Sequence, residues 1–315
     1  MTQITYETSA ERGLVFDIKR FALHDGTGIR TTAFLKGCPL RCPWCQNPEG
    51  ISIHRQVWYD HNRCIRCGKC AQVCDNGAVT LHPKSEYYVS VNQEKCRKCG
   101  YKCVHACPTG ALSFDSKFYT VNELADRLER DKVFYEASGG GMTLSGGDPF
   151  FQTEFAYAVF SECKRRGMHT AIETELVTSR NKLEKFIPVV DLFMTDLKIW
   201  DNKIHLATVG AENTIIKDNI RFLAQQGVAL IVRMPLIPEI TTTKENISSI
   251  AKFVAELPGD VLFELINFNP LASGKYRMLQ KKYAFELYTS PYPAKEYWEF
   301  VKISKEAGAH VIGNP

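Results

Sequence analysis

Residues 30–50, RTTAFLKGCPLRCPWCQNPEG, join an apolar run to three closely spaced cysteines. The first part, RTTAFLKG, is short and rich in β-branched and apolar residues, which predicts a buried strand. Cys38, Cys42 and Cys45 follow it directly. Three thiolates can hold three irons of a 4Fe–4S cluster and leave the fourth iron without a protein ligand. The stretch therefore predicts an iron–sulfur loop at the end of a strand, with one position open to a substrate.

Strand-like and helix-like segments alternate along the sequence from residue 141 onward. Short apolar runs predict strands at 141–147, 168–174, 190–198, 228–236 and 261–270. Amphipathic stretches predict helices at 152–166, 179–188, 213–227, 243–257 and 293–308. With the run at 30–37 there are six predicted strands. Strand followed by helix, repeated, is typical of a parallel sheet covered by helices.

Residues 54–116 interrupt this alternation. The segment is rich in cysteine and lacks long periodic stretches, apart from a strand-like piece at 86–92. The helical pattern resumes at 121–138. We therefore predict a small domain at 54–116, inserted into a larger domain that consists of residues 1–53 and 117–315.

Polar, charged and glycine residues gather where the predicted strands end. Because the carboxyl ends of parallel strands face one common site, we expect these residues to meet the first cysteine group in one pocket. They are Ser145, Gly146, Gly147, Asp148, Glu173, Thr174, Asp196, Lys198, Arg233 and Asn269.

Composition and charge narrow the class of protein. The 39 basic residues are scattered among 35 acidic ones, with a net charge of +4, which does not favour nucleic-acid binding. No run of about 18 apolar residues predicts a membrane helix, and the N-terminal MTQITYETSAERG lacks the pattern of a signal peptide. We expect a cytoplasmic protein, so its 12 cysteines need an explanation other than structural disulfides.

Eight of the remaining cysteines form two groups of four whose spacing resembles that of bacterial two-cluster ferredoxins. In those proteins the fourth cysteine of each run binds the other cluster. The resemblance implies two 4Fe–4S clusters, one held by Cys64, Cys67, Cys70 and Cys107, the other by Cys96, Cys99, Cys103 and Cys74. Paired CxxC units also bind structural zinc, and that alternative stays open. Cys163 stands apart in a helical pattern, where a packing role is expected.

The CxxxCxxC spacing with Trp44 before its last cysteine resembles the signature loop of the radical S-adenosylmethionine superfamily. The resemblance implies a partial (β/α)6 TIM-like barrel, an α/β fold, and S-adenosylmethionine bound to the open iron. It also implies that the cofactor is contacted by Trp44, Gly146, Gly147, Asp148, Lys198, Arg233 and Asn269. Asp148 replaces the usual Glu of a GGE motif, and Asn269 stands where many relatives have His. A zinc knuckle is the alternative for this loop.

Glu173, Thr174 and Asp196 resemble the oxygen ligands of a monovalent cation in related enzymes, and hard oxygen donors suit such an ion. The resemblance therefore implies a cation beside the methionine part of the cofactor. Caps at the ends of ordinary strands would have the same residue types, which leaves a second interpretation open.

The opening segment, HDGTGIRT at 24–31, together with Asn47-Pro48-Glu49, resembles the signature of glycyl-radical activating enzymes. Thr27 replaces a proline of the usual motif. The resemblance implies reductive cleavage of S-adenosylmethionine to a 5′-deoxyadenosyl radical, which removes hydrogen from a glycine of a partner glycyl-radical enzyme. It also implies flavodoxin or ferredoxin as the reductant. No general acid or base is needed, so we assign none.

Two other functions compete with this interpretation. A radical S-adenosylmethionine enzyme could act on a small molecule or peptide, but such enzymes usually carry their extra cysteines after the barrel. A ferredoxin-type electron carrier would explain the two four-cysteine groups and leave the loop at 38–45 unexplained. The position of the extra cysteines directly after the first loop favours the activating enzyme.

Overall fold

The computed structural model describes residues 8–96 and 99–313. The predicted larger domain begins at residue 1 and ends at residue 315, and both of these residues lie outside the described ranges. One nine-stranded sheet forms the main body, in the order β13-β12-β11-β10-β9-β8-β2-β1-β7. The strands from β13 to β2 run parallel, whereas β1 is antiparallel to both β2 and β7. The sheet is thus an open, mostly parallel barrel with two antiparallel strands at one edge.

All six predicted strands are present in this sheet. They are β2 (Arg30–Leu35), β8 (Gly141–Gly146), β9 (Thr170–Thr174), β10 (Leu192–Asp196), β11 (Ala229–Pro235) and β12 (Leu262–Ile266). Three more strands were not predicted: β1 (Arg12–Ala22), β7 (Lys117–Thr120) and β13 (His310–Ile312). The predicted partial barrel is confirmed, with a longer sheet than the sequence indicated.

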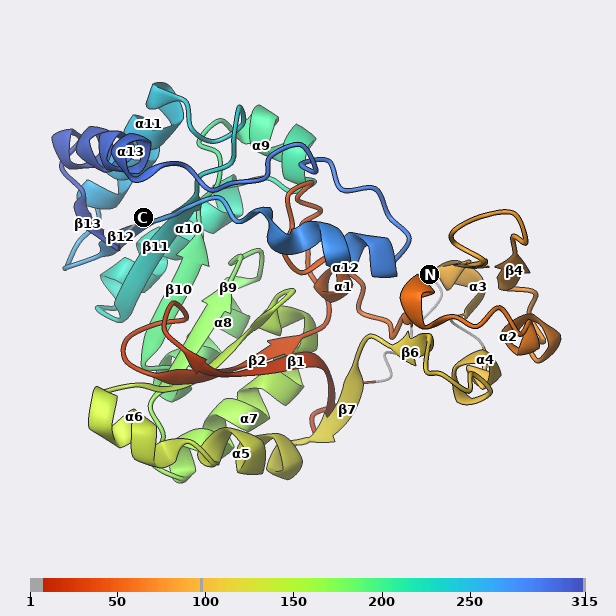
Figure 1. Ribbon diagram of the computed structural model, residues 1–315. Coiled ribbons are helices and arrows are strands. Elements are labelled where there is room, and N and C mark those ends of the chain that lie inside the picture. The colour runs from red at the N-terminus through yellow and green to blue at the C-terminus, as the bar shows by residue number, and fades with distance from the viewer. Residues whose placement is uncertain (1–7, 97–98, 314–315) are drawn as a thin grey trace.

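Helices cover one face of the sheet, as Figure 1 shows for α5 and α7, which lie along β1 and β2. The helices of the barrel are α5 (Val121–Glu129), α6 (Lys132–Ser138), α7 (Thr153–Arg165), α8 (Arg180–Phe186), α9 (Asn202–Val209), α10 (Thr214–Gln225), α11 (Lys244–Ala255), α12 (Ser273–Met278) and α13 (Ala294–Glu306). Alternate strand residues, such as Ile172 and Phe193, join side chains of α7, α10 and α11 in the main core. Because helices cover this face, the strand ends and the opposite face of the sheet are left for the functional site.

The helix predicted at 121–138 is divided into α5 and α6. Thr120 begins α5 with a capping box, in which its side chain and that of Glu123 satisfy each other's main-chain N–H groups. The break falls at Asp131, which is fully buried and accepts hydrogen bonds from Arg20 Nε at 2.8 Å and Thr31 Oγ1 at 2.7 Å. The carboxylate at this break thus holds both β1 and β2.

A small lobe rich in cysteine projects from the barrel, on the right in Figure 1. It contains two pairs of short antiparallel strands, β3 (Val57–Tyr59) with β6 (Leu112–Phe114) and β4 (Val79–Leu81) with β5 (Val89–Val91). Its helices are α2 (Lys69–Gln72), α3 (Gln93–Cys96) and α4 (Lys102–His105), and α1 (Pro48–Ile51) precedes it. Its core is built largely from cysteine, valine and tyrosine side chains.

A buried ion pair fastens this lobe to the barrel. Lys36, at the end of β2, is fully buried and pairs with Asp115, while its Nζ also donates to the carbonyl of Glu49 at 2.7 Å. Asp115 in turn accepts hydrogen bonds from the Gln56 N–H at 2.9 Å and the Ser116 hydroxyl at 2.7 Å. Lys36, which precedes the cysteine loop, is therefore linked through Asp115 to both segments in which the chain passes between barrel and lobe, one at Gln56 and one at Asp115.

Within the described residues, no helix is long and apolar enough to cross a membrane.

Candidate functional site

A cavity of about 470 Å³ lies at the carboxyl ends of the parallel strands. Its wall combines the first cysteine loop with the ends of β8, β9, β10 and β11, as expected from the sequence. The predicted residues that line it are Cys42, Trp44, Cys45, Ser145, Gly146, Gly147, Glu173, Thr174, Asp196, Lys198 and Arg233. Segments far apart in the sequence therefore meet around one space.

Glycines bring the cysteine loop against the end of β8. Gly147 N–H donates to the Leu35 carbonyl at 2.8 Å. A Cβ added at Gly147 would lie 2.2 Å from the Gly37 carbonyl oxygen, and one at Gly146 would lie 2.3 Å from the main chain of Leu35. Contacts this short are impossible without movement of the backbone, so the two glycines permit the close approach of strand and loop.

The three thiols of this loop lie close enough to influence one another. Burial raises the pKa of Cys45 to about 11, and it raises the pKa of Cys42 as well. The negative charge of Cys45 further raises the pKa of both Cys38 and Cys42. The three thiols, none of them in a disulfide, lie in one short loop, as the three protein ligands of a 4Fe–4S cluster would.

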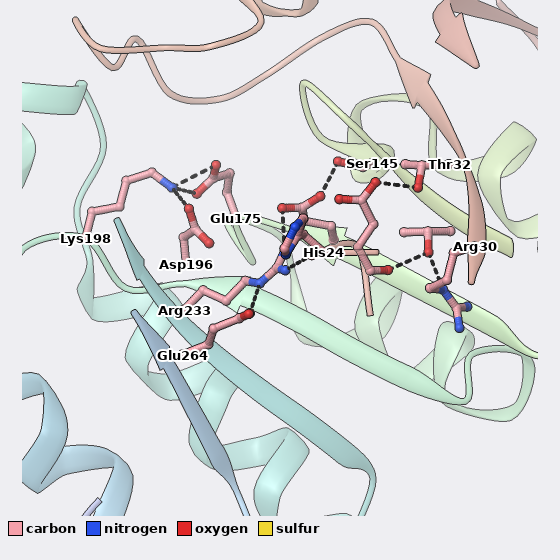
Figure 2. A network of polar contacts seen from close by, with 12 residues as sticks. His24, Arg30, Thr32, Ser145, Glu175, Asp196, Lys198, Arg233 and Glu264 are labelled. Atoms are coloured by element: carbon pink, nitrogen blue, oxygen red, sulfur yellow. Dashed lines mark hydrogen bonds and ion pairs between the residues drawn. The ribbon is translucent and has the colours of Figure 1, made fainter. Parts of the chain in front are cut away.

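Lys198 is held between two carboxylates at the edge of the cavity. Its Nζ lies 2.7 Å from Asp196 Oδ2 and 2.7 Å from Glu175 Oε2, as Figure 2 shows. Burial lowers the pKa of Lys198, but the two carboxylates outweigh it and hold the pKa well above its usual value. Burial raises the pKa of Glu175 to about 7. Glu175, which the sequence interpretation missed, thus lies beside the predicted cofactor contact.

Arg233 forms a second charged centre, from the next strand of the sheet (Figure 2). Its NH1 donates to Glu173 Oε1 at 2.8 Å and its Nε to Glu264 Oε2 at 2.7 Å. The guanidinium also donates to the main-chain carbonyl of His24. Burial lowers the pKa of Arg233, but Glu173 and Glu264 raise it above its usual value overall. Arg233 therefore stays charged and ties the segment around His24 to the strand ends.

Asp148, predicted to contact the cofactor, does not line the cavity and is almost completely buried. Its carboxylate accepts hydrogen bonds from Phe150 N at 2.8 Å, Glu175 N at 2.9 Å and Thr174 Oγ1 at 3.0 Å. Burial raises its pKa to about 6 against the effect of these bonds. In this arrangement Asp148 fixes the end of β9.

Trp44 and Asn269 differ in their relation to the cavity. Trp44 lines it and packs edge-on against Phe285, with ring centroids 6.3 Å apart. The side chain of Asn269 accepts the Leu271 N–H at 2.9 Å and caps the 3-10 helix η4 (Pro270–Ala272), and Asn269 does not belong to the cavity lining.

The residues predicted to hold a monovalent cation are each engaged by other groups. Glu173 accepts the Ser145 hydroxyl at 2.5 Å and pairs with Arg233, Thr174 bonds to Asp148, and Asp196 pairs with Lys198. In residues 8–96 and 99–313, no group of three or more His, Cys, Asp or Glu side chains is placed to hold a single metal ion. These contacts do not test the predicted cation site, which stays a prediction.

In the small lobe the cysteines lie in the two predicted sets. Cys64, Cys67, Cys70 and Cys107 line one small pocket. Burial raises the pKa of Cys96 to about 12, with further contributions from Cys99, Cys103 and Cys74. The fourth cysteine of each run is thus beside the first three of the other run. Cys163 is buried in the main core, apart from both sets.

Further residues line the cavity without having been predicted: Asp17, Lys19, His24, Asp25, Gln46, Asn47, Glu175 and Lys275. Three of these could have been found, because His24 and Asp25 belong to the HDGTGIRT segment and Asn47 to the Asn47-Pro48-Glu49 motif that the sequence singled out. Asp17 and Lys19 alternate on β1, but β1 itself was not predicted.

Comparison with known proteins identifies the family. Residues 94–253 match the radical SAM superfamily, and residues 63–111 match a 4Fe-4S dicluster domain. An isethionate sulfite-lyase activating enzyme from Oleidesulfovibrio alaskensis is 38% identical over 88% of this chain and 90% of its own length. An indoleacetate decarboxylase activating enzyme from Tractidigestivibacter scatoligenes is 36% identical over 86% of this chain and 88% of its own length.

A solved domain of a pyruvate-formate lyase-activating enzyme from Bacteroides vulgatus aligns with 55% of this chain and 98% of its own length, at 24% identity and a TM-score of 0.46. The dicluster match contains all eight cysteines of the small lobe, and the radical SAM match contains Gly146, Gly147, Lys198 and Arg233. The chain belongs to the radical S-adenosylmethionine superfamily and, within it, to the activating enzymes of glycyl-radical enzymes.

Proposed function

We propose that this activating enzyme binds S-adenosylmethionine in the 470 Å³ cavity, beside a 4Fe–4S cluster held by Cys38, Cys42 and Cys45. The observation that carries the proposal is the position of the cysteine loop at a cavity lined by charges of both signs. A ligand with an amino group, a carboxylate and a sulfonium needs both. Carboxylates come from Glu173, Glu175 and Asp196, and cations from Lys198 and Arg233.

Each residue has a role in holding the cofactor. The main chain at Gly146 and Gly147 lies open to the amino group, Lys198 pairs with the carboxylate, and Arg233 contacts the ribose or the carboxylate. Trp44 packs beside the cofactor. Asp148 and Asn269, also predicted as contacts, act through the loops that they cap.

When bound, the cluster and S-adenosylmethionine supply one-electron cleavage to a 5′-deoxyadenosyl radical, which removes hydrogen from the substrate. The substrate is the glycine loop of a glycyl-radical enzyme. The enclosed charged wall holds the cofactor in place, and no side chain needs to move a proton. Relatives are named for isethionate sulfite-lyase, indoleacetate decarboxylase and (2S)-3-sulfopropanediol dehydratase, and the partner of this chain is an enzyme of that kind.

The small lobe supplies electrons. We assign it residues 54–116, with the barrel formed by 1–53 and 117–315. Cys64, Cys67, Cys70 and Cys107 hold one 4Fe–4S cluster, and Cys96, Cys99, Cys103 and Cys74 hold another. The support is the pocket that the first set lines and the mutual effects on pKa in the second. Flavodoxin or ferredoxin in the cytoplasm delivers the electron.

A monovalent cation is a separate part of the proposal. Glu173 and Asp196 would have to exchange Arg233 and Lys198 for the ion once the cofactor is bound. Comparing the affinity for S-adenosylmethionine in sodium, potassium and bulky organic-cation buffers tests this, and equal affinities in all three would remove the cation.

The proposed function is tested by anaerobic reconstitution with iron and sulfide, reduction, and assay of 5′-deoxyadenosine. We expect product from the intact chain and none after replacement of Cys38, Cys42 and Cys45 by Ala. The matched control is Cys163→Ala, which removes a cysteine that lies apart from all three sets and should keep the activity.

The partner is identified by adding isethionate sulfite-lyase, indoleacetate decarboxylase or sulfopropanediol dehydratase and recording the glycyl radical by electron paramagnetic resonance. Product without a radical on any partner would point to the small-molecule or peptide substrate instead. A chain that binds iron and never cleaves S-adenosylmethionine would be an electron carrier.

A further inference from the structure

Strand β1 has a free edge beside the cavity. It pairs with β2 from Val15 to Ala22, but β7 covers its other edge only from Arg12 to Val15. Among the described residues, no strand pairs with the remainder of that edge, which we call the free edge, Phe16–Phe21. An unpaired edge offers main-chain donors and acceptors to another strand.

A β-bulge turns the main chain at the point where β7 ends. Val15 lies opposite Leu35 and Asp17 lies opposite Phe34, so Phe16 is one extra residue on β1. Bulges commonly end a pairing and redirect the strand. Beyond this one, the N–H of Ile18 donates to the Asp17 carboxylate at 2.8 Å. A side chain thus takes the place that a neighbouring strand's carbonyl would have.

Residues of the free edge line two cavities of the molecule. Asp17 and Lys19 line the 470 Å³ cavity of the proposed cofactor site. Val15 to Ile18 also line a second groove of about 680 Å³, which continues along Ser116 and Lys117 toward the small lobe. Two exposed apolar side chains, Phe21 and Leu23, lie at the end of the free edge that is farther from β7. A polypeptide along this edge would pass from the groove to the mouth of the cavity.

We propose that the free edge binds the glycine-bearing segment of the partner enzyme as an added β-strand, and this inference rests on the proposed function. The reacting atom is a main-chain Cα of a residue without a side chain. Main-chain hydrogen bonds can position such an atom, whereas a side-chain pocket cannot recognise it. An added strand lies about 4.8 Å from its neighbour, here on the edge whose side chains form the cavity wall.

The charges along the edge fit this function. Asp17, Lys19 and Arg20 are exposed, and charged residues on an edge strand oppose pairing between identical chains. The Asp17 carboxylate covers the Ile18 N–H until a carbonyl of the partner replaces it. The edge is thereby closed to copies of this chain and open to a strand of matching charge.

Hydrogen–deuterium exchange tests the proposal with the intact chain and the member of the partner panel that acquires the radical. We expect slower exchange in peptides that cover residues 16–21 when the partner is added. Radical formation without any change in these peptides would overturn the added strand while leaving the proposed function intact.

A matched pair of variants gives a second test. Ile18→Pro removes the outward N–H, and proline is tolerated at such edge positions. Ile18→Ala removes the side chain and keeps the N–H. We expect the KM for the partner to rise about tenfold in the proline variant and to stay within about twofold in the alanine variant, since one main-chain hydrogen bond is lost only in the first. Cleavage of S-adenosylmethionine without partner should match the wild type in both. Equal KM values in the two variants would contradict the proposal.

Discussion

At the scale of single residues, Lys198 is the cation on which the charged wall depends. Lys198→Met keeps the length of the side chain but leaves Asp196 and Glu175 without the ammonium that lies 2.7 Å from each. Removing one partner of a buried pair typically costs about 3–5 kcal/mol. We expect a loss of this size in the free energy of unfolding, measured anaerobically in denaturant, together with weaker binding of S-adenosylmethionine.

The control for this variant is Lys185→Met. Lys185 pairs with Glu154 at the same distance, 2.7 Å, but these two side chains are 39% and 62% exposed. Such surface pairs contribute about 0–1 kcal/mol. A loss in Lys198→Met no larger than that in Lys185→Met would show that the buried pair has no special role.

Glu175 gives the site a dependence on pH. Its pKa rises on folding from 4.5 to about 7, because burial disfavours the carboxylate. Between these two pH values the folded state binds more protons than the unfolded state. The contribution of Glu175 to the free energy of unfolding therefore falls as the pH rises from about 4.5 to 7, and it is constant above pH 7. We expect Glu175→Gln to lack this fall, in unfolding of the apo-protein at pH 5 to 8. Parallel curves for the two proteins would contradict the assignment.

The sequence predicted Lys198 and Arg233 because both lie at the ends of strands that are easily recognised. Glu175 escaped because it follows the last residue of β9, where the chain turns. Glu173 and Glu175 are residues i and i+2 of an extended segment, which share one face, and both line the cavity. Extending the predicted strand by one residue would therefore have found Glu175.

At the scale of elements, the contact between β8 and the cysteine loop depends on the absence of a side chain at Gly147. Gly147→Ala would place a Cβ about 2.2 Å from the Gly37 carbonyl, so the loop must move. If the three proposed clusters are present, we expect the reconstituted variant to lose about four of about twelve irons and the ability to cleave S-adenosylmethionine, and to keep the two clusters proposed for the small lobe.

Gly274 in α12 provides the comparison for this substitution, because a Cβ there would have no neighbour within 4 Å. Gly274→Ala should keep the full iron content. Iron analysis and electron paramagnetic resonance distinguish the two variants, and a full iron content in Gly147→Ala would disprove the steric argument.

The elements that the sequence predicted are those buried on both sides. Strands β8 to β11 read as apolar runs because helices cover one face and the barrel interior the other. Strand β1 was missed because Asp17 and Lys19 face the cavity and break its apolar pattern. The division of α5 and α6 was missed because Arg20 and Thr31, which bond to Asp131 at the break, lie far away in the sequence.

At the scale of the whole molecule, the buried pair of Lys36 and Asp115 joins the barrel to the small lobe. Lys36→Met leaves a buried carboxylate without its cation, for which we expect a loss of about 3–5 kcal/mol in the free energy of unfolding. Adding Asp115→Asn removes the uncompensated charge and should recover part of that loss. Additive losses in the double variant would show that the two residues are not coupled.

The two crossings between barrel and lobe also bond directly to each other. The Asp115 N–H donates to the Gln56 carbonyl at 3.1 Å, and the Gln56 N–H donates to the Asp115 side chain at 2.9 Å. The chain therefore leaves the barrel and returns to it at a single point. In evolutionary terms the segment between these residues resembles a cassette, because its two ends already lie within hydrogen-bond distance of each other and a short turn could join them.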